Sequence, residues 1–94
     1  MDRDKILMVL CAQDYPDYML EQTVDKVEHM DEKIKAAFEE WVETGIAPTF
    51  EIEDWTYGKL IQSFKMRPVA AFLALDWLIK EPENASKALK RGIR

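Results

Sequence analysis

The stretch from Val69 to Ile79 constrains the fold more than any other part of this sequence, because Asp76 is its only residue that is not apolar. At about 100° per residue, Val69, Asp76 and Lys80 fall on one narrow strip of a helix, and apolar side chains cover the rest of the circumference. A helix that is apolar almost all round is a buried one. The sequence therefore predicts a central buried helix near residues 68–80.

Several shorter helical segments precede this one. We expect a first helix from a cap at Asp4 to about Gln13. Within residues 17–44, apolar side chains recur in steps of three and four and the series breaks at Asp31. This pattern predicts either one long helix or two, with Asp31 capping the second, and we favour two. Gly45 is the expected end of this segment.

The second half of the chain predicts two further helices beside the central one. Residues 46–53 alternate between polar and apolar side chains but have no obvious partner strand, so we interpret them as a packed connection. Asp54 or Thr56 is expected to cap a helix that runs to about Phe64. A last helix is expected from about Pro82 to just before Gly92, burying Ala85, Ala88 and Leu89.

The size and composition suit one domain. The chain has 94 residues, of which 48% are hydrophobic, and this is enough apolar surface for a single core. We predict an all-α fold: one domain over residues 1–94, built as a compact bundle of five or six short helices.

The only cysteine and the apolar runs bear on the compartment. Cys11 has no partner for an internal disulfide and lies in the apolar run 6–12, where we expect it to be buried. No signal peptide is evident, and no apolar run approaches the roughly 20 residues that span a bilayer. We expect a cytoplasmic protein without a membrane partner.

Charge is distributed unevenly along the chain. Residues 1–60 contain fifteen Asp and Glu against six Lys and Arg, a net charge of −9, whereas residues 61–94 contain three against seven, a net charge of +4. This layout indicates either a solvated surface with basic residues placed at helix C-termini, or one end that steers a charged partner.

Residues 56–80 contain a capped short helix with Leu60, a tight turn around Met66 and a second helix ending in residues 75–78. This pattern, over about a quarter of the chain, resembles a helix-turn-helix of the winged-helix type. The resemblance implies that the second helix enters the major groove and presents polar side chains to the bases. Here that helix offers mainly alanine and phenylalanine, with Arg67 near its start, so we expect the motif without its DNA-binding function.

Little in the sequence supports catalysis. His29 is the only histidine, it has acidic neighbours, and no cysteine lies near it to complete a metal site. Ser63 and Ser86 lack a nucleophile motif, and the three glycines form no phosphate-binding loop. We therefore expect no enzyme activity, no cofactor and no metal site.

Two groups of residues are candidates for contacts with a partner. Aromatic residues near turns and helix starts favour a protein interface, and these are Trp55, Tyr57, Tyr15 and Tyr18. Basic residues in the last third are candidates for contacts with phosphate or an acidic partner, namely Arg67, Lys87, Lys90 and Arg91.

These observations favour a small, cytoplasmic, non-enzymatic protein-interaction or regulatory module. The expected partner is an unidentified protein or a second copy of the chain in a homodimer. One alternative is a DNA-associated helix-turn-helix protein that uses its basic C-terminal helices. Another is an acidic inhibitor that mimics nucleic acid with the carboxylates of residues 14–54. The acidic first two-thirds argues against nucleic acid as the partner.

Overall fold

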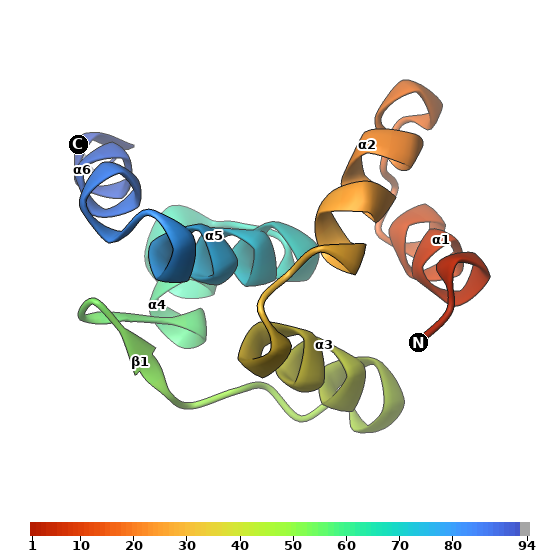
Figure 1. The fold of residues 1–94 in the computed structure, drawn as a ribbon, viewed down its shortest axis with the longest axis horizontal. Helices are drawn as coiled ribbons and strands as arrows, with labels where there is room; N and C mark the ends of the chain where they lie inside the picture. Colours follow the sequence, from red (N-terminus) through yellow and green to blue (C-terminus); the bar gives the residue numbers. More distant parts are fainter. Residues whose placement is uncertain (93–94) are drawn as a thin grey trace.

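The structure, a computed structural model, describes residues 1–92 and has six helices and two short strands within them (Figure 1). The all-α fold expected from the sequence is confirmed. No helix of the described chain is both long and apolar enough to cross a bilayer. The elements in chain order are α1 (Arg3–Ala12), α2 (Asp17–Glu28), α3 (Glu32–Thr44), β1 (Glu51–Ile52), β2 (Trp55–Thr56), α4 (Tyr57–Phe64), α5 (Pro68–Lys80) and α6 (Pro82–Gly92).

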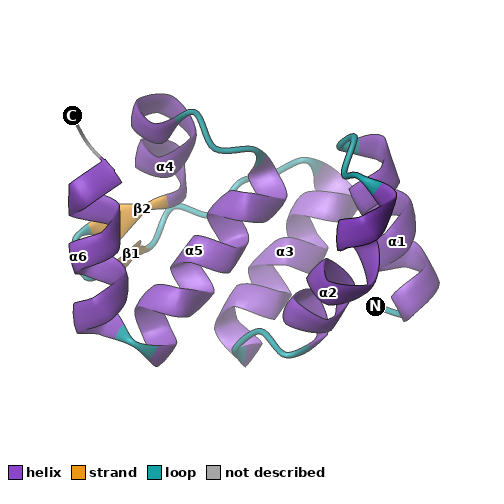
Figure 2. Cartoon of the chain, turned by 90° about the horizontal axis from the view of Figure 1, so that it is seen from above, coloured by secondary structure: helices purple, strands orange, loops and turns teal. Residues whose placement is uncertain are grey.

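Helix α5 lies at the centre of the molecule, as predicted, and packs against α3, α4, α6 and β1 (Figure 2). Its residues Val69, Phe72 and Leu75 are fully buried. The rings of Phe72 and of Phe38 from α3 form a T-shaped pair, with centroids 5.3 Å apart. Burial of one such side chain contributes about 1.5–3 kcal/mol, so α5 supplies much of the core.

The exposed face of α5 does not coincide with the strip that contains Val69, Asp76 and Lys80. Val69 and Asp76 are both buried, with Asp76 only 7% exposed, and Lys80 is the exposed residue of that strip. Trp77 is instead 37% exposed, and Ala70 and Leu73 on the same side are partly exposed. Asp76 is buried because it finds polar partners inside the structure.

The carboxylate of Asp76 joins α5 to the connection between α2 and α3. Its Oδ1 accepts a hydrogen bond from the backbone N–H of Asp31 at 2.7 Å, and its Oδ2 lies 2.9 Å from Nζ of Lys80. Lys80 also donates to the carbonyl of His29 at 2.6 Å. Because a charge is tolerated inside a protein only when it is paired and hydrogen-bonded, these contacts explain an acid in an otherwise apolar segment.

Local signals set most of the helix ends. Residues 17–44 form two helices, and Asp31 caps the second by accepting from the N–H of Lys33. Gly45 ends it with φ of 76°, a conformation that suits glycine. The first helix is capped by Asp2 rather than by the expected Asp4, because Asp2 is extended and already accepts from the N–H of Lys5.

Residues 46–53 are not the strand-free connection that we expected. Ile52 pairs with Trp55 and Glu51 with Thr56 in a two-residue antiparallel hairpin. Glu53 and Asp54 at its turn have φ of 51° and 68°, as a tight primed turn requires. The partner strand therefore follows directly in the chain. The expected Thr56 cap also forms, accepting from the N–H of Lys59.

Two residues expected inside are exposed. Helix α1 buries Ile6 and Leu10 on the side that meets α2, and Cys11 lies off that face and is exposed. Helix α6 buries Ala85 and Leu89 against α5, and Ala88 projects outward. Peripheral helices cover only one face here, so an apolar residue off that face remains exposed.

Ion pairs hold α1 to α2. The guanidinium of Arg3 lies 2.9 Å from Oδ1 of Asp25 and also pairs with Glu21 and Glu28 of α2. The hydrogen bonds that Arg3 donates to the carboxylates of Asp25 and then Glu21 hold its pKa above the ordinary value. The arrangement places three carboxylates of α2 on the side that faces α1.

Replacing Asp76 tests the polar contact at the centre of the fold. We expect Asp76→Ala to lower the free energy of unfolding by about 2 kcal/mol, because the N–H of Asp31 loses a charged acceptor. Asp76→Asn keeps an acceptor oxygen and should cost less. Urea denaturation measures both variants, and an Asp76→Ala variant as stable as the parent protein would contradict this role.

The exposure of Cys11 predicts its reactivity. Ellman's reagent should modify one thiol in the folded protein at a rate comparable to that in denaturant, because no packed side chains have to move. Cys11→Ser should change the free energy of unfolding by less than about 0.5 kcal/mol. A thiol that reacts only after unfolding would show instead that this side of α1 is covered.

Candidate functional site

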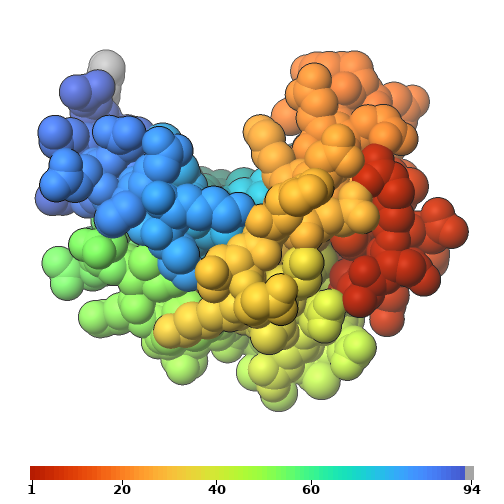
Figure 3. All heavy atoms as spheres, in the orientation of Figure 1, coloured from red at the N-terminus to blue at the C-terminus, as the bar shows by residue number. Residues whose placement is uncertain are grey.

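A groove runs along the open face of α5, between α2 and α6. In the space-filling view it is the hollow between the orange atoms of α2 and the blue atoms of α6, with cyan atoms of α5 at its floor (Figure 3). Its volume is about 580 Å³. The side chains that line it are mostly apolar and include Ala70, Leu73 and Trp77 of α5, Met19 of α2, Met66 before α5, and Leu89 of α6.

The groove follows from the number of helices available. Helix α5 is apolar almost all round, but α3, α4 and α6 cover only part of it, and α2 rises away from it to pack against α1 (Figure 1). Ala70, Leu73 and Trp77 occupy positions i, i+3 and i+7, so they form one continuous face of the helix. An exposed apolar face of this kind is typical of an interaction site.

The groove contains one tryptophan whose ring is held in place and two methionines whose side chains are flexible. The indole Nε1 of Trp77 donates to Oε2 of Glu81 at 3.0 Å, which fixes the ring against α5. Met19 and Met66 are unbranched and polarizable, and such side chains adjust to the shape of a partner. Tryptophan is enriched among the residues that dominate binding energies.

Tyr15 provides a polar group at the other end of the groove. Burial raises the pKa of its phenol, and the positive charge of Arg67 opposes that shift. The hydroxyl therefore stays protonated near neutral pH and is able to donate a hydrogen bond to an occupant.

The structure corrects half of the predicted aromatic interface. Trp55 and Tyr57 are 3% and 7% exposed, so neither is available at the surface. The hairpin and the first turn of α4 direct both rings inward, Trp55 onto Phe64 and Tyr57 onto Phe72. Tyr15 lines the groove, and Tyr18 is 81% exposed but is not among the lining residues.

Sequence reasoning missed the residues that form most of the groove, among them Leu73 and Trp77. The sequence feature that could have indicated the groove is the predicted helix over residues 68–80. A helix without a polar face, in a domain with few other elements, has more apolar surface than its neighbours are able to cover.

The predicted basic contacts do not form one site. Arg67 is exposed at the start of α5 and donates to the carbonyl of Gln13. Lys87 and Lys90 line a separate depression of about 370 Å³ that also contains Glu53 and Glu83, and it shares no lining residue with the groove. Arg91 is exposed on α6.

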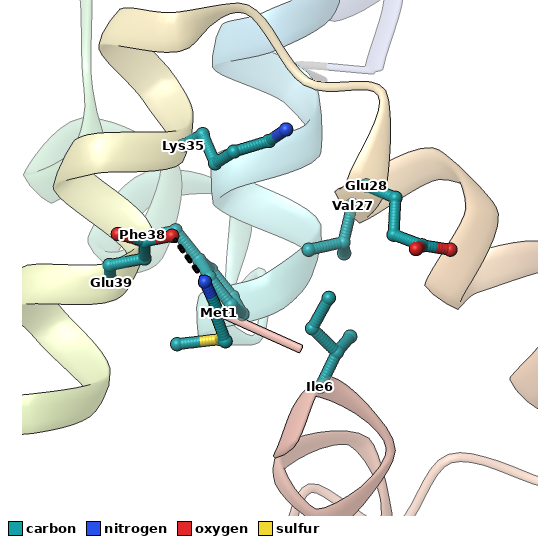
Figure 4. A pocket seen from close by; sticks show the side chains of 7 residues that line it. All are labelled: Met1, Ile6, Val27, Glu28, Lys35, Phe38 and Glu39. Atoms are coloured by element: carbon teal, nitrogen blue, oxygen red, sulfur yellow. Dashed lines mark hydrogen bonds and ion pairs between the residues drawn. The ribbon is translucent and has the colours of Figure 1, made fainter. Parts of the chain in front are cut away.

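The other hollows offer less for chemistry. A small one of about 110 Å³ is lined by Met1, Glu39 and neighbouring side chains, and the amino group of Met1 lies 3.1 Å from Oε1 of Glu39 (Figure 4). The Nδ1 atom of His29 lies 2.7 Å from the carbonyl oxygen of Asp25. Within residues 1–92, no group of three or more His, Cys, Asp or Glu side chains is arranged to hold a metal ion.

None of the protein-family models, curated proteins or solved structures compared with this chain matches it.

A matched pair of substitutions tests whether the two sides of α5 differ. Ala71 is fully buried and Ala70, next to it, lies in the groove. Ala71→Asp should lower the free energy of unfolding by about 4 kcal/mol, because it buries an unpaired carboxylate. Ala70→Asp should cost less than about 1 kcal/mol, since an acid in the first turn also complements the helix dipole.

Thermal and urea denaturation distinguish the two variants. Equal losses from both substitutions would mean that the face of α5 with Ala70 is packed, and the groove would then be absent.

Proposed function

We propose that this chain is a non-enzymatic, cytoplasmic protein-interaction module that binds an amphipathic helix of a protein partner in the groove between α2, α5 and α6. The observation that carries the proposal is the open apolar face of α5, where Leu73 and the 37% exposed Trp77 lie between two helical walls. Binding of an amphipathic helix in an apolar groove is a recurring mode of peptide recognition.

The shape of the groove favours a helix over a small molecule. Its lining residues on α5 run from Ala70 to Lys80, about 15 Å along the helix axis and almost three turns. A partner helix of three to four turns has apolar anchors at i, i+4, i+7 and i+11, which span about 16 Å and so match this length. A small ligand is usually enclosed over 70–90% of its surface, and a groove flanked by two helices leaves a larger share of it open.

The small residues at the floor also suit a helix. Ala70 and Ala74 have short side chains, so the backbone of an occupant is able to approach α5 closely. Packed helices lie 8–10 Å apart, and the shorter distances need small side chains at the contact.

A DNA-associated role remains a second candidate because Lys87, Lys90 and Arg91 of α6 are exposed. It has weaker support. Glu53 and Glu83 lie in the same depression as the two lysines, and α5 presents Ala70, Leu73 and Trp77 rather than groups that bond to base edges. A salt-sensitive mobility shift with duplex DNA, lost when Lys87 and Lys90 become Glu, would favour this role.

Selection from a displayed library of amphipathic helices tests the proposed function. We expect binders whose affinity falls at least tenfold for the Leu73→Glu variant, because a charge then replaces an apolar contact at the floor of the groove. Tyr18→Glu is the matched control, since Tyr18 is exposed but lies outside the lining. Circular dichroism checks that both variants fold.

The proposal fails if the library gives no binder, or if every binder recognises the Leu73→Glu variant as well as the parent protein. The second result would place the interaction on another surface.

A further inference from the structure

We infer that the partner helix carries a carboxylate on the edge facing α2, where it pairs with Lys26. This inference rests on the proposed function, because it specifies the chemistry of the helix that the groove accepts. It follows from the charges that line the groove and from which of them already have partners.

Four charged side chains line the groove, and three of them have partners within the molecule. Asp76 and Lys80 pair with each other at 2.9 Å. Glu81 accepts from the indole of Trp77 at 3.0 Å and from the amide of Asn84 at 3.3 Å. Lys26 has no ion pair or side-chain hydrogen bond within residues 1–92.

The acids of α2 do not compensate Lys26. Glu21, Asp25 and Glu28 bind Arg3 on the side of α2 that faces α1. The α2 residues that line the groove are Met19, Thr23 and Lys26, and Lys26 is the only charged one of the three. The apolar wall of the groove therefore has a single positive charge on the α2 side.

A partner helix bound in the groove would exclude water from around Lys26. A helix lying over Leu73 and Trp77 displaces water from the groove, and charge interactions strengthen where water is excluded. A lysine or arginine on the partner's edge would be repelled by Lys26, whereas a glutamate there would pair with it. Such complementarity mainly determines which partner binds and in which register.

The charge of the whole chain argues against a second copy as the occupant. The net charge is −5, so two copies repel each other at long range. A two-fold dimer that pairs the groove with itself would also place a second Lys26 at the groove, and the two lysines would repel each other. We therefore assign the groove to a separate helical protein with an acidic edge.

The inference is tested with a displayed library of amphipathic helices in which one position, beside the apolar anchors on the edge that faces α2, is Glu, Gln or Lys. We expect Glu to be enriched in binders that depend on Leu73. A synthetic Glu-edged peptide should bind the Lys26→Glu variant about fivefold more weakly than the parent protein, and the Lys-edged version should bind that variant more tightly. Lys87→Glu is the matched control, because it changes net charge equally on a lysine outside the groove.

The outcomes separate the inference from the function on which it rests. Leu73-dependent binders with no preference for Glu, or a preference that Lys26→Glu leaves unchanged, overturn the inference and leave the proposed function in place. A library without Leu73-dependent binders overturns the function itself. Sedimentation of the chain alone adds one check: dimers that dissociate in the Leu73→Glu variant would assign the groove to a second copy and overturn the inference.

Discussion

The hydrogen bond and the ion pair of Asp76 position the connection between α2 and α3 on the central helix α5. They fix the chain between α2 and α3 to the C-terminal half of α5, with the N–H of Asp31 at 2.7 Å. From this point α3 packs beside α5, and α2 leads away toward α1 (Figure 1). The divergence of α2 from α5 leaves one face of the central helix open, so the groove depends on a contact at its end.

Features that depend on neighbouring residues in the chain were predictable. The bounds of α5, the cap at Asp31 and the stop at Gly45 all follow from local rules for helix ends. Exposure was less predictable, because it depends on which distant element covers a side chain. Trp55 and Trp77 illustrate the difference: both are tryptophans near helix ends, yet the hairpin buries the first and the divergence of α2 exposes the second.

The groove also reflects how few helices a chain of this length has to cover its central helix. Six short helices enclose one core, and the apolar surface of α5 exceeds what they cover. The charged side chains of α2 are divided in the same way: Arg3 pairs with three acids of α2 on the side that faces α1, and Lys26 lies at the groove. An apolar floor with a single unpaired charge at its edge defines the proposed partner: an amphipathic helix with an acidic edge.

NMR of side-chain methyl and indole signals with a soluble paramagnetic agent tests most directly whether α5 is a core helix with one open face. The structure predicts strong attenuation of the Leu73 methyls and the Trp77 indole, and protection of the Leu75 and Leu78 methyls, which are almost fully buried. Protection of all four side chains would show that the groove is closed. Attenuation of all four would show that α5 is not the centre of the core.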